Sequence, residues 1–315
     1  MNFGMIGAAG YVAPRHLAAI AAVGGRLLVA QDIADSARAL DEHFPEAAFF
    51  TGIDRLERHL VKEARDGRRL DYVSICSPNH LHDAHIRFAL RNGADAICEK
   101  PVVINPWNLD LLRDEERRHG HRVWTILQLR LLPALVALRE RVEAAETVRR
   151  FSVDLSYITE RGGWYFASWK GEEELSGGIA TNIGIHFFDL LQWIFGSVQE
   201  MQVHVRRPEV VAGTLKLERA DVRWFLSVDA AHLPGHVRSE GGRTFRSITV
   251  DSEELDFTAY SAEDLHTASY RRILAGEGFG LDEAAPSVRI THDVRTVPLS
   301  RPDGTVHPKV PEVLA

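Results

Sequence analysis

The first 125 or so residues alternate short apolar runs with segments of helical periodicity, and this alternation restricts the fold more than any other feature. The apolar runs are nearly continuous, as in strands that are buried on both faces of a parallel sheet. We expect strands at 3–6, 27–30, 72–76, 94–98 and 122–126, and helices at 13–23, 34–43, 53–65, 80–92 and 106–119. The pattern predicts an α/β domain with a doubly wound parallel sheet.

The second half of the chain follows a different pattern. A helix is expected from Pro133 to about Ala145, and alternating apolar residues then predict strands at 149–159, 199–206, 210–217, 221–229, 244–250 and 253–257. Successive strands joined by short turns indicate a large, mostly antiparallel open sheet in an α+β domain. The 315 residues are enough for two cores, and we predict domains at 1–127 and 128–315.

A glycine-rich turn joins the first predicted strand to the first helix. Gly7 suits the tight turn, Gly10 lets the backbone approach a pyrophosphate, and Ala13 stands where the third glycine of a dinucleotide-binding loop is usual. The second strand ends at Asp32, 22 residues beyond Gly10, where an acid binds ribose hydroxyls and repels a 2′-phosphate. We therefore predict a Rossmann domain that binds NAD rather than NADP, with a loop that also includes Ala9, Tyr11 and Val12.

Two other strand ends carry polar groups to the same crevice. The third predicted strand, at 72–76, is followed by Ser77-Pro78-Asn79, where Asn79 is expected to cap the next helix. Another strand ends in Glu99-Lys100-Pro101, which is read either as a simple salt bridge or as a lysine presented to a ligand. His82 and His85 share a helix face, but they have no third ligand at suitable spacing, so no metal is predicted.

Charge and composition exclude several classes of partner. The net charge of −7 argues against a nucleic-acid surface or an anionic membrane. No apolar run is long enough to cross a membrane, and residues 1–7 lack the features of a signal peptide. Cys76 and Cys98 lie inside apolar segments and are expected to be buried and reduced, as in a cytoplasmic protein.

Three motifs in this order, the glycine-rich turn, Ser77-Pro78-Asn79-His80-Leu81-His82 and Cys98-Glu99-Lys100-Pro101, resemble those of the Gfo/Idh/MocA oxidoreductases. The resemblance implies a Rossmann domain followed by an α/β substrate domain that packs in oligomers, here as a homotetramer. It also implies that Lys100 stands beside the nicotinamide and the reacting hydroxyl. The implied cofactor contacts beyond the first turn and Asp32 are Ser77, Asn79, His82, Glu99, Lys100 and Gln128.

The segment 177–194 carries a second signature. If it is helical, Asn182, His186 and Asp189 share one face. A helical histidine among apolar residues is most often structural, but the resemblance makes His186 the candidate general base, and an ordinary pKa near 6.5 suits proton transfer. Many family members carry aspartate where this chain has Asn182, which leaves acid-base chemistry to His186 and Lys100 and favours a neutral imidazole.

Residues 156–171 combine aromatic side chains with arginine and lysine, as suits a sugar face and an anionic group. This stretch, with Asn182 and segments 223–229, 246–248 and 264–267, resembles the family branch of bacterial UDP-N-acetylglucosaminuronate 3-dehydrogenases of the WlbA/WbpB type. The branch oxidises the sugar 3-hydroxyl to a ketone in O-antigen and lipopolysaccharide synthesis. Leu175 departs from the lysine that the branch is expected to carry. The implied substrate contacts are Lys100, Arg161, Trp164, Tyr165, Ser168, Lys170, Asn182, His186, Arg246 and Ser247.

Other functions compatible with the motifs remain open. Another dehydrogenase of this family, acting on a free sugar or polyol, would keep Lys100 and His186 without needing the cationic residues. An NAD-dependent glycosidase and a non-catalytic NAD-binding sensor are further alternatives, although a sensor has no use for an acid-base pair. The residues do not distinguish release of NADH from its reoxidation in place by 2-oxoglutarate.

Overall fold

The chain forms two compact units, Met1–Leu131 with Ser261–Ala285, and Leu132–Tyr260 with Pro286–Ala315. The computed structural model describes residues 1–35, 38–257, 262–302, 304 and 306–314, without the side chains of Asp256 and of residues 262–264. The expected division into 1–127 and 128–315 does not include the return of 261–285 to the first unit. This return follows from packing, because Tyr270 and Ile273 are buried in one core with Phe3 and Leu17.

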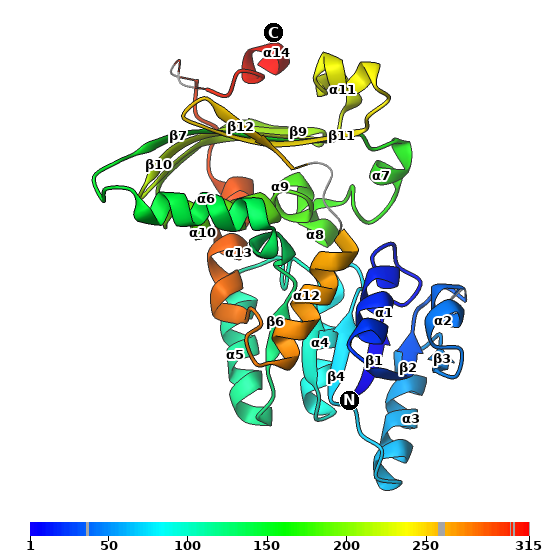
Figure 1. Cartoon of the computed structure of the whole chain (residues 1–315). Coiled ribbons are helices and arrows are strands. Elements are labelled where there is room, and N and C mark those ends of the chain that lie inside the picture. Colours follow the sequence, from blue (N-terminus) through cyan, green and yellow to red (C-terminus); the bar gives the residue numbers. More distant parts are fainter. Residues whose placement is uncertain (36–37, 258–261, 303, 305, 315) are drawn as a thin grey trace. The chain divides into compact units, whose positions relative to one another are not determined.

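The sheet of the first unit is parallel throughout, as the near-continuous apolar runs predict. Its strand order is β3-β2-β1-β4-β5-β6 (Figure 1). Five of its strands lie where they were expected, while β3 was missed because it has only three, half-buried residues. The strands are β1 (Asn2–Ile6), β2 (Arg26–Gln31), β3 (Ala48–Phe50), β4 (Tyr72–Ile75), β5 (Asp95–Cys98) and β6 (Val123–Thr125).

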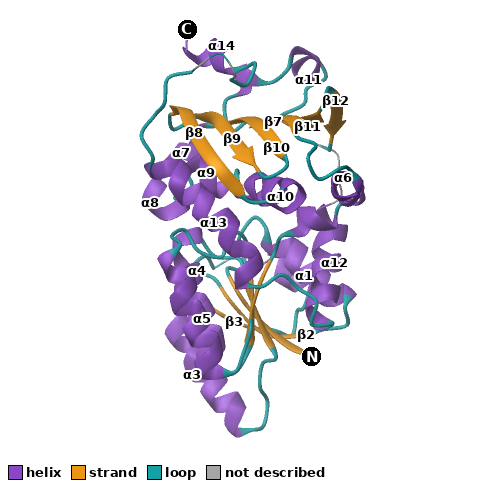
Figure 2. Cartoon of the chain, turned by 90° about the vertical axis from the view of Figure 1, so that its left-hand side faces the viewer, coloured by secondary structure: helices purple, strands orange, loops and turns teal. Residues whose placement is uncertain are grey.

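Helices cover both faces of this sheet. In Figure 2, α1 and α12 lie on one side of it and α3, α4 and α5 on the other. Residues 36–37 of the helix expected at 34–43 lie outside the described residues, and α2 accounts for the remainder from residue 38. The helices are α1 (Ala13–Ala22), α2 (Arg38–His43), α3 (Ile53–Arg65), α4 (His82–Arg91), α5 (Trp107–His119) and α12 (Ala262–Leu274), with short 3-10 helices at Asn79–Leu81 and Gln128–Leu131.

The sheet of the second unit has the order β12-β11-β7-β10-β9-β8. Only β7 and β10 pair in parallel, so the sheet is mixed and mostly antiparallel, which confirms the predicted fold class. All six strands lie within two residues of their predicted bounds at either end. They are β7 (Phe151–Thr159), β8 (Val198–Arg206), β9 (Val210–Leu217), β10 (Ala220–Ser227), β11 (Thr244–Val250) and β12 (Glu253–Asp256).

The two faces of this second sheet bury different cores. Tyr157 and Trp224 contact Phe187 and Phe188 of α10 on one face, whereas Ile158 and Phe225 pack with α14 on the other. Figure 1 shows α6 and α10 on one side of the sheet and α11 and α14 on the opposite side. The helices are α6 (Pro133–Ala144), α7 (Gly163–Ala167), α8 (Glu173–Ser176), α9 (Gly178–Asn182), α10 (Ile185–Phe195), α11 (Gly235–Ser239) and α14 (Val310–Leu314), with a 3-10 helix at Ala230–His232. α13 (Leu281–Thr296) begins in the first unit and continues in the second from Pro286.

Cys76 and Cys98 are buried free thiols, as their apolar surroundings predict. Burial raises the pKa of both thiols well above the usual value, so they are poor nucleophiles and poor metal ligands. Among the described residues, every helix is too short or too polar to span a bilayer.

Candidate active site

The glycine-rich turn is built against the end of β4. Gly7 has a φ of +86°, and a Cβ there would lie 2.6 Å from the backbone carbon of Cys76 and from the amide nitrogen of Ser77. A Cβ on Gly10 would lie 3.1 Å from the Gly7 carbonyl oxygen. Only glycine fits the first position, and the turn therefore presents bare backbone in front of α1, as a pyrophosphate requires.

Asp32 ties the end of β2 to this turn. Its Oδ2 accepts a hydrogen bond of 2.9 Å from the Ala9 amide, and its Oδ1 accepts one of 2.9 Å from the Ala34 amide. Each carboxylate oxygen has further acceptor capacity, so the residue is held in place and still able to bind hydroxyl groups. Tyr11 is 80% exposed beside the turn, and Val12, which is partly buried, precedes the first turn of α1.

The loop after β4 is held by contacts of a buried histidine with two backbone carbonyl oxygens. His82 is buried, with Nδ1 2.6 Å from the Pro101 carbonyl oxygen and Nε2 2.8 Å from the Ser77 carbonyl oxygen. It therefore links the loops that follow β4 and β5. Asn79 was expected to cap α4, but it lies in the preceding 3-10 helix, and Leu81 occupies the N-cap. Ser77 has its hydroxyl 2.8 Å from Nδ1 of His85, whose pKa is lowered by burial to about 4.

The end of β5 presents the charged pair that the sequence singled out. Glu99 is buried, and its Oε1 lies 3.0 Å from Nε2 of His16 and 3.1 Å from Nε2 of His266. Its Oε2 accepts a hydrogen bond of 3.2 Å from the Lys100 amide, and the Lys100–Pro101 peptide bond is cis. Glu99, His16 and His266 also form the group of potential metal ligands found within the described part of the chain, with ligand atoms that lie within 4.8 Å of one another.

Gln128 lies just beyond β6, buried in the 3-10 helix that follows it. Its carboxamide oxygen is buried and has no hydrogen-bond partner among the described residues. Burying a polar atom without a partner is costly, so an orphaned acceptor near the strand ends fits a site whose ligand supplies the donor. Together with the turn at Gly7 and Gly10, this residue makes the first unit suited to NAD.

In the second unit, the segment around His186 is broken into two helices. α9 ends at Asn182 and α10 begins at Ile185, so the expected single helical face of Asn182, His186 and Asp189 does not form. The break occurs at Gly184, where a Cβ would lie 2.6 Å from the Ala180 carbonyl oxygen. His186 lies in the first turn of α10 and is half-buried, whereas Asp189 is buried.

Asn182 faces a buried tyrosine. Its Nδ2 donates a hydrogen bond of 3.1 Å to the hydroxyl oxygen of Tyr165, which is 2% exposed. Burial raises the pKa of this phenol, so Tyr165 stays protonated over the working range of an enzyme. The pair brings two of the predicted substrate residues together, from α9 and α7.

Cationic and aromatic side chains gather around α7, as the sequence predicts. The Lys170 ammonium lies 5.9 Å from the ring centre of Trp164 and 4.4 Å from that of Trp169, and Cζ of Arg161 lies 6.0 Å from the Trp164 ring. Trp164 is 54% exposed, which leaves its ring available for a sugar. Ser168 turns its hydroxyl back to the Tyr165 carbonyl oxygen, at 2.9 Å, and so shapes this loop.

Arg246 and Ser247 were both expected to contact the substrate, but they point to opposite faces of the sheet. Arg246 pairs with Tyr157 and lies over its ring at 5.3 Å, on the face covered by α10. Ser247 is buried on the face of Phe245 and donates a hydrogen bond of 2.6 Å to Glu254. Because neighbouring residues of a strand alternate between faces, the two side chains cannot line one site.

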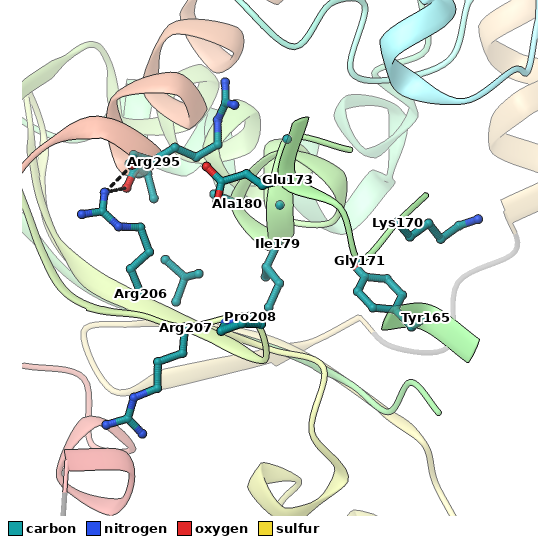
Figure 3. Close-up of a pocket in the computed structure, with 14 residues that line it drawn as sticks. Tyr165, Lys170, Gly171, Glu173, Ile179, Ala180, Arg206, Arg207, Pro208 and Arg295 are labelled. Carbon is teal, nitrogen blue, oxygen red and sulfur yellow. Dashed lines mark hydrogen bonds between the residues drawn. The ribbon is translucent and has the colours of Figure 1, made fainter. Parts of the chain in front are cut away.

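A cavity of about 230 Å³ in the second unit contains residues that sequence reasoning missed. Figure 3 shows Arg206, Arg207 and Arg295 on one side of it and Tyr165 with Lys170 on the other. Arg206 donates hydrogen bonds to the carbonyl oxygens of Val294, Arg295 and Val297, at the C-terminal end of α13. Arg206 and Arg207 stand at the end of a strand predicted at 199–206, which was a visible signal, but no local pattern connects them with Arg295.

Comparison with known proteins agrees with this architecture. Residues 1–127 match a model described as "Oxidoreductase family, NAD-binding Rossmann fold", and residues 139–243 match its C-terminal alpha/beta domain. The structure of the WlbA (WbpB) dehydrogenase from Thermus thermophilus superposes with a TM-score of 0.95 at 50% identity, covering 98% of this chain and 100% of that one. That enzyme was crystallised with NAD and UDP-GlcNAcA, and with NAD and alpha-ketoglutarate.

Curated relatives match over shorter stretches. The putative oxidoreductase YteT of Bacillus subtilis is 28% identical over 50% of this chain, and the D-glucoside 3-dehydrogenase of Escherichia coli is 29% identical over 42%. The matches span only 36% and 39% of those two proteins. The two family models, the strand order of both sheets and the whole-chain similarity lead to one conclusion: this chain belongs to the Gfo/Idh/MocA family of NAD-dependent oxidoreductases.

Proposed function

We propose that the protein uses NAD to oxidise the 3-hydroxyl of UDP-N-acetylglucosaminuronate to a ketone. The observation that carries this proposal is the 50% identity, over nearly the whole of both chains, to the Thermus thermophilus WlbA dehydrogenase, which binds NAD and UDP-GlcNAcA. The side chains that suit an anionic sugar nucleotide, among them Arg161 and Lys170, lie in the second unit. These residues agree with the substrate that the similarity suggests.

The first unit supplies the cofactor contacts. NAD, when bound, supplies the hydride acceptor. Gly7 and Gly10 leave room for its pyrophosphate at the start of α1, and Asp32 accepts hydrogen bonds from the adenosine ribose. Gln128 offers its buried carboxamide oxygen to a donor on the ligand. The negative charge of Asp32 also disfavours a 2′-phosphate, so the preferred cofactor is NAD.

Lys100 and His186 are proposed to handle the proton. His186 accepts the proton of the 3-hydroxyl as the carbon loses hydride, and Lys100 donates a hydrogen bond to the same oxygen and stabilises its negative charge. Asn182 does not share this task, because its amide donates to Tyr165 and a carboxamide is no base at neutral pH. The acid-base chemistry thus needs only two side chains.

The anionic groups of the substrate are assigned to the cluster around α7. Arg161 and Lys170 provide positive charge beside the exposed Trp164 ring, and an arginine there matches a carboxylate with two parallel hydrogen bonds. Arg246 is a further candidate on the sheet face covered by α10. Ser247 is withdrawn from the substrate set because its hydroxyl is buried against Glu254.

We further propose that 2-oxoglutarate reoxidises the NADH. The support is the alpha-ketoglutarate found with NAD in the Thermus thermophilus enzyme. In this step 2-oxoglutarate gains a hydride and a proton to become 2-hydroxyglutarate, and NAD is regenerated. A compound with two carboxylates suits the same cationic side chains that the uronate needs.

The wider setting belongs to the proposal as well. Oxidation of this sugar nucleotide would serve O-antigen and lipopolysaccharide synthesis in the cytoplasm, where the reduced state of Cys76 and Cys98 is maintained. A homotetramer is the arrangement that the family resemblance implies. Sedimentation analysis of the purified protein tests the oligomer directly.

The deciding experiment measures NADH formation by absorbance after the protein is mixed with NAD and UDP-N-acetylglucosaminuronate. UDP-N-acetylglucosamine is the matched control, since it has a hydroxymethyl group in place of the carboxylate, and a parallel sample contains 2-oxoglutarate. We expect NADH to form with the uronate and not with UDP-N-acetylglucosamine. If NADH stays bound and is reoxidised there, we expect 2-hydroxyglutarate in the parallel sample. Absence of both products would reject the substrate. Activity on a free glucoside instead would favour a reaction like that of the D-glucoside 3-dehydrogenase relative.

A further inference from the structure

A buried hydrogen-bond network surrounds Glu99, the residue before the proposed catalytic lysine. The Tyr270 hydroxyl lies 2.8 Å from Nδ1 of His16 and 2.6 Å from the Ser74 hydroxyl. Nε2 of His16 and Nε2 of His266 both reach Oε1 of Glu99, at 3.0 and 3.1 Å. All five side chains are buried, so the network is shielded from water.

The protons of this network can be placed from its partners. Ser74 donates to the Tyr270 oxygen, Tyr270 donates to Nδ1 of His16, and His16 donates from Nε2 to Glu99. Burial lowers the pKa of His16, which agrees with a neutral ring. Burial alone would raise the pKa of Glu99, but the hydrogen bonds from His16 and His266 outweigh it and hold that pKa well below the usual value. Glu99 is therefore an ionised carboxylate with two imidazole donors on one oxygen.

The other oxygen of Glu99 reaches the backbone of its neighbour. Oε2 accepts the Lys100 amide hydrogen at 3.2 Å. We propose that His16 and His266 are positioning residues: they hold the Glu99 carboxylate, and its second oxygen thereby fixes the backbone from which the Lys100 side chain projects. The inference rests on the proposed function, in which Lys100 contacts the reacting oxygen.

The origin of the donors explains why α12 belongs to the first unit. His266 and Tyr270 are four residues apart, so they share one face of α12. His16 lies on α1, and its ring meets those of His266 and Tyr270 edge-on, at 5.1 and 5.7 Å between centres. Docking of α12 on α1 thus supplies the donor for Glu99 together with the hydroxyl that orients His16.

Two variants of one position separate a positioning role from a structural one. In His266→Gln, the amide nitrogen can still donate to Glu99, whereas His266→Leu removes the donor at similar volume. Ile273→Ala is the matched control, because Ile273 is buried on the same helix outside the network. A misplacement of about 1 Å can cost up to about 100-fold in rate. We expect kcat of His266→Leu to fall about tenfold or more, with KM and the Kd for NAD nearly unchanged, and His266→Gln to recover most of it.

A second readout needs no substrate. The chain has 5 lysines, so [15N]lysine labelling gives few amide resonances, and Lys100→Arg identifies the one of interest. The Lys100 amide resonance of the NAD-bound protein should move in His266→Leu and stay near its native position in His266→Gln and Ile273→Ala. An unmoved resonance in His266→Leu overturns the proposal.

Three other results overturn the proposal: equal kcat losses in His266→Leu and His266→Gln, an equal loss in Ile273→Ala, or a bound metal ion at one per chain that His266→Leu removes. Failure of the proposed function looks different. The native protein would then be inactive on UDP-N-acetylglucosaminuronate. The Lys100 amide resonance would still move in His266→Leu and not in His266→Gln or Ile273→Ala.

Discussion

Replacing Gly7 by alanine tests whether the turn after β1 is shaped by backbone contact. An alanine with a positive φ costs about 1–2 kcal/mol relative to glycine, and Gly7 has a φ of +86°. Gly24 provides the matched control, because its φ is +71° and a Cβ there meets nothing within 4 Å. At Gly7 the same Cβ would lie 2.6 Å from backbone atoms of Cys76 and Ser77, which cannot turn aside as a side chain can. Gly7→Ala must therefore cost more than Gly24→Ala, and it must push the turn away from the end of β4.

Thermal unfolding and calorimetric titration with NAD measure the two consequences separately. For a unit of this size, Gly24→Ala should lower Tm by about 2–8 °C, since each kcal/mol corresponds to about 2–4 °C. Its Kd for NAD should stay at the native value. Gly7→Ala should lower Tm further and weaken NAD binding by about tenfold or more, the loss of a hydrogen bond to a charged group. Equal Tm shifts and equal Kd values in the two variants would refute the reasoning.

Three other predictions follow from single side chains. Asp32→Ser should raise the Kd for NAD about tenfold and reduce the preference over NADP, since it removes a charged acceptor of the ribose; an unchanged ratio of the two Kd values would exclude this role. Arg161→Met should raise KM for the uronate sharply and leave the Kd for NAD unchanged, whereas Arg243→Met, which removes an exposed ion pair with Glu160, should do neither. Burial lowers the pKa of His307 to about 4, and its Nδ1 accepts the Lys309 amide hydrogen. Between pH 6.5 and 4 the unfolded chain binds a proton that folded His307 does not, so the free energy of unfolding should fall by about 1.4 kcal/mol per pH unit as the pH is lowered. When urea unfolding is measured at several pH values, the free energy of unfolding of His307→Gln should fall less steeply as the pH is lowered. An unchanged dependence on pH would contradict the assignment.

Much of the fold could be predicted because its strands are regular in sequence. The continuous apolar runs of the first unit and the alternating runs of the second placed all strands except β3, whose three residues are only half-buried. The failures have local causes. The helix expected through Asn182 and His186 breaks at Gly184, where the chain passes too close to Leu226 and Ala180 for a side chain. Asn79, expected at the N-cap of α4, lies instead in the 3-10 helix that precedes α4.

The site was harder to predict than the fold, because its residues depend on pairings far apart in the chain. Alternation along the strand expected at 244–250 already places Arg246 and Ser247 on opposite faces, so the sequence alone could have shown that they do not line one site together. The donors of Glu99 were not visible in the same way. His16 and His266 are separated by nearly the whole chain, and neither stands in a local pattern that distinguishes it from an ordinary buried histidine.

The strand ends of the first unit are held by side chains that bind backbone atoms and by a glycine packed against backbone, and this determines which substitutions matter. Gly7 rests on the backbone at Cys76 and Ser77, Asp32 accepts the Ala9 amide hydrogen, and His82 contacts the Ser77 and Pro101 carbonyl oxygens. Glu99 extends the same scheme to the Lys100 amide. A side chain that hydrogen-bonds a backbone group fixes the position of the residue that carries that group, whatever the type of that residue. These contacts hold the backbone at the strand ends, and Lys100 projects from the end of β5.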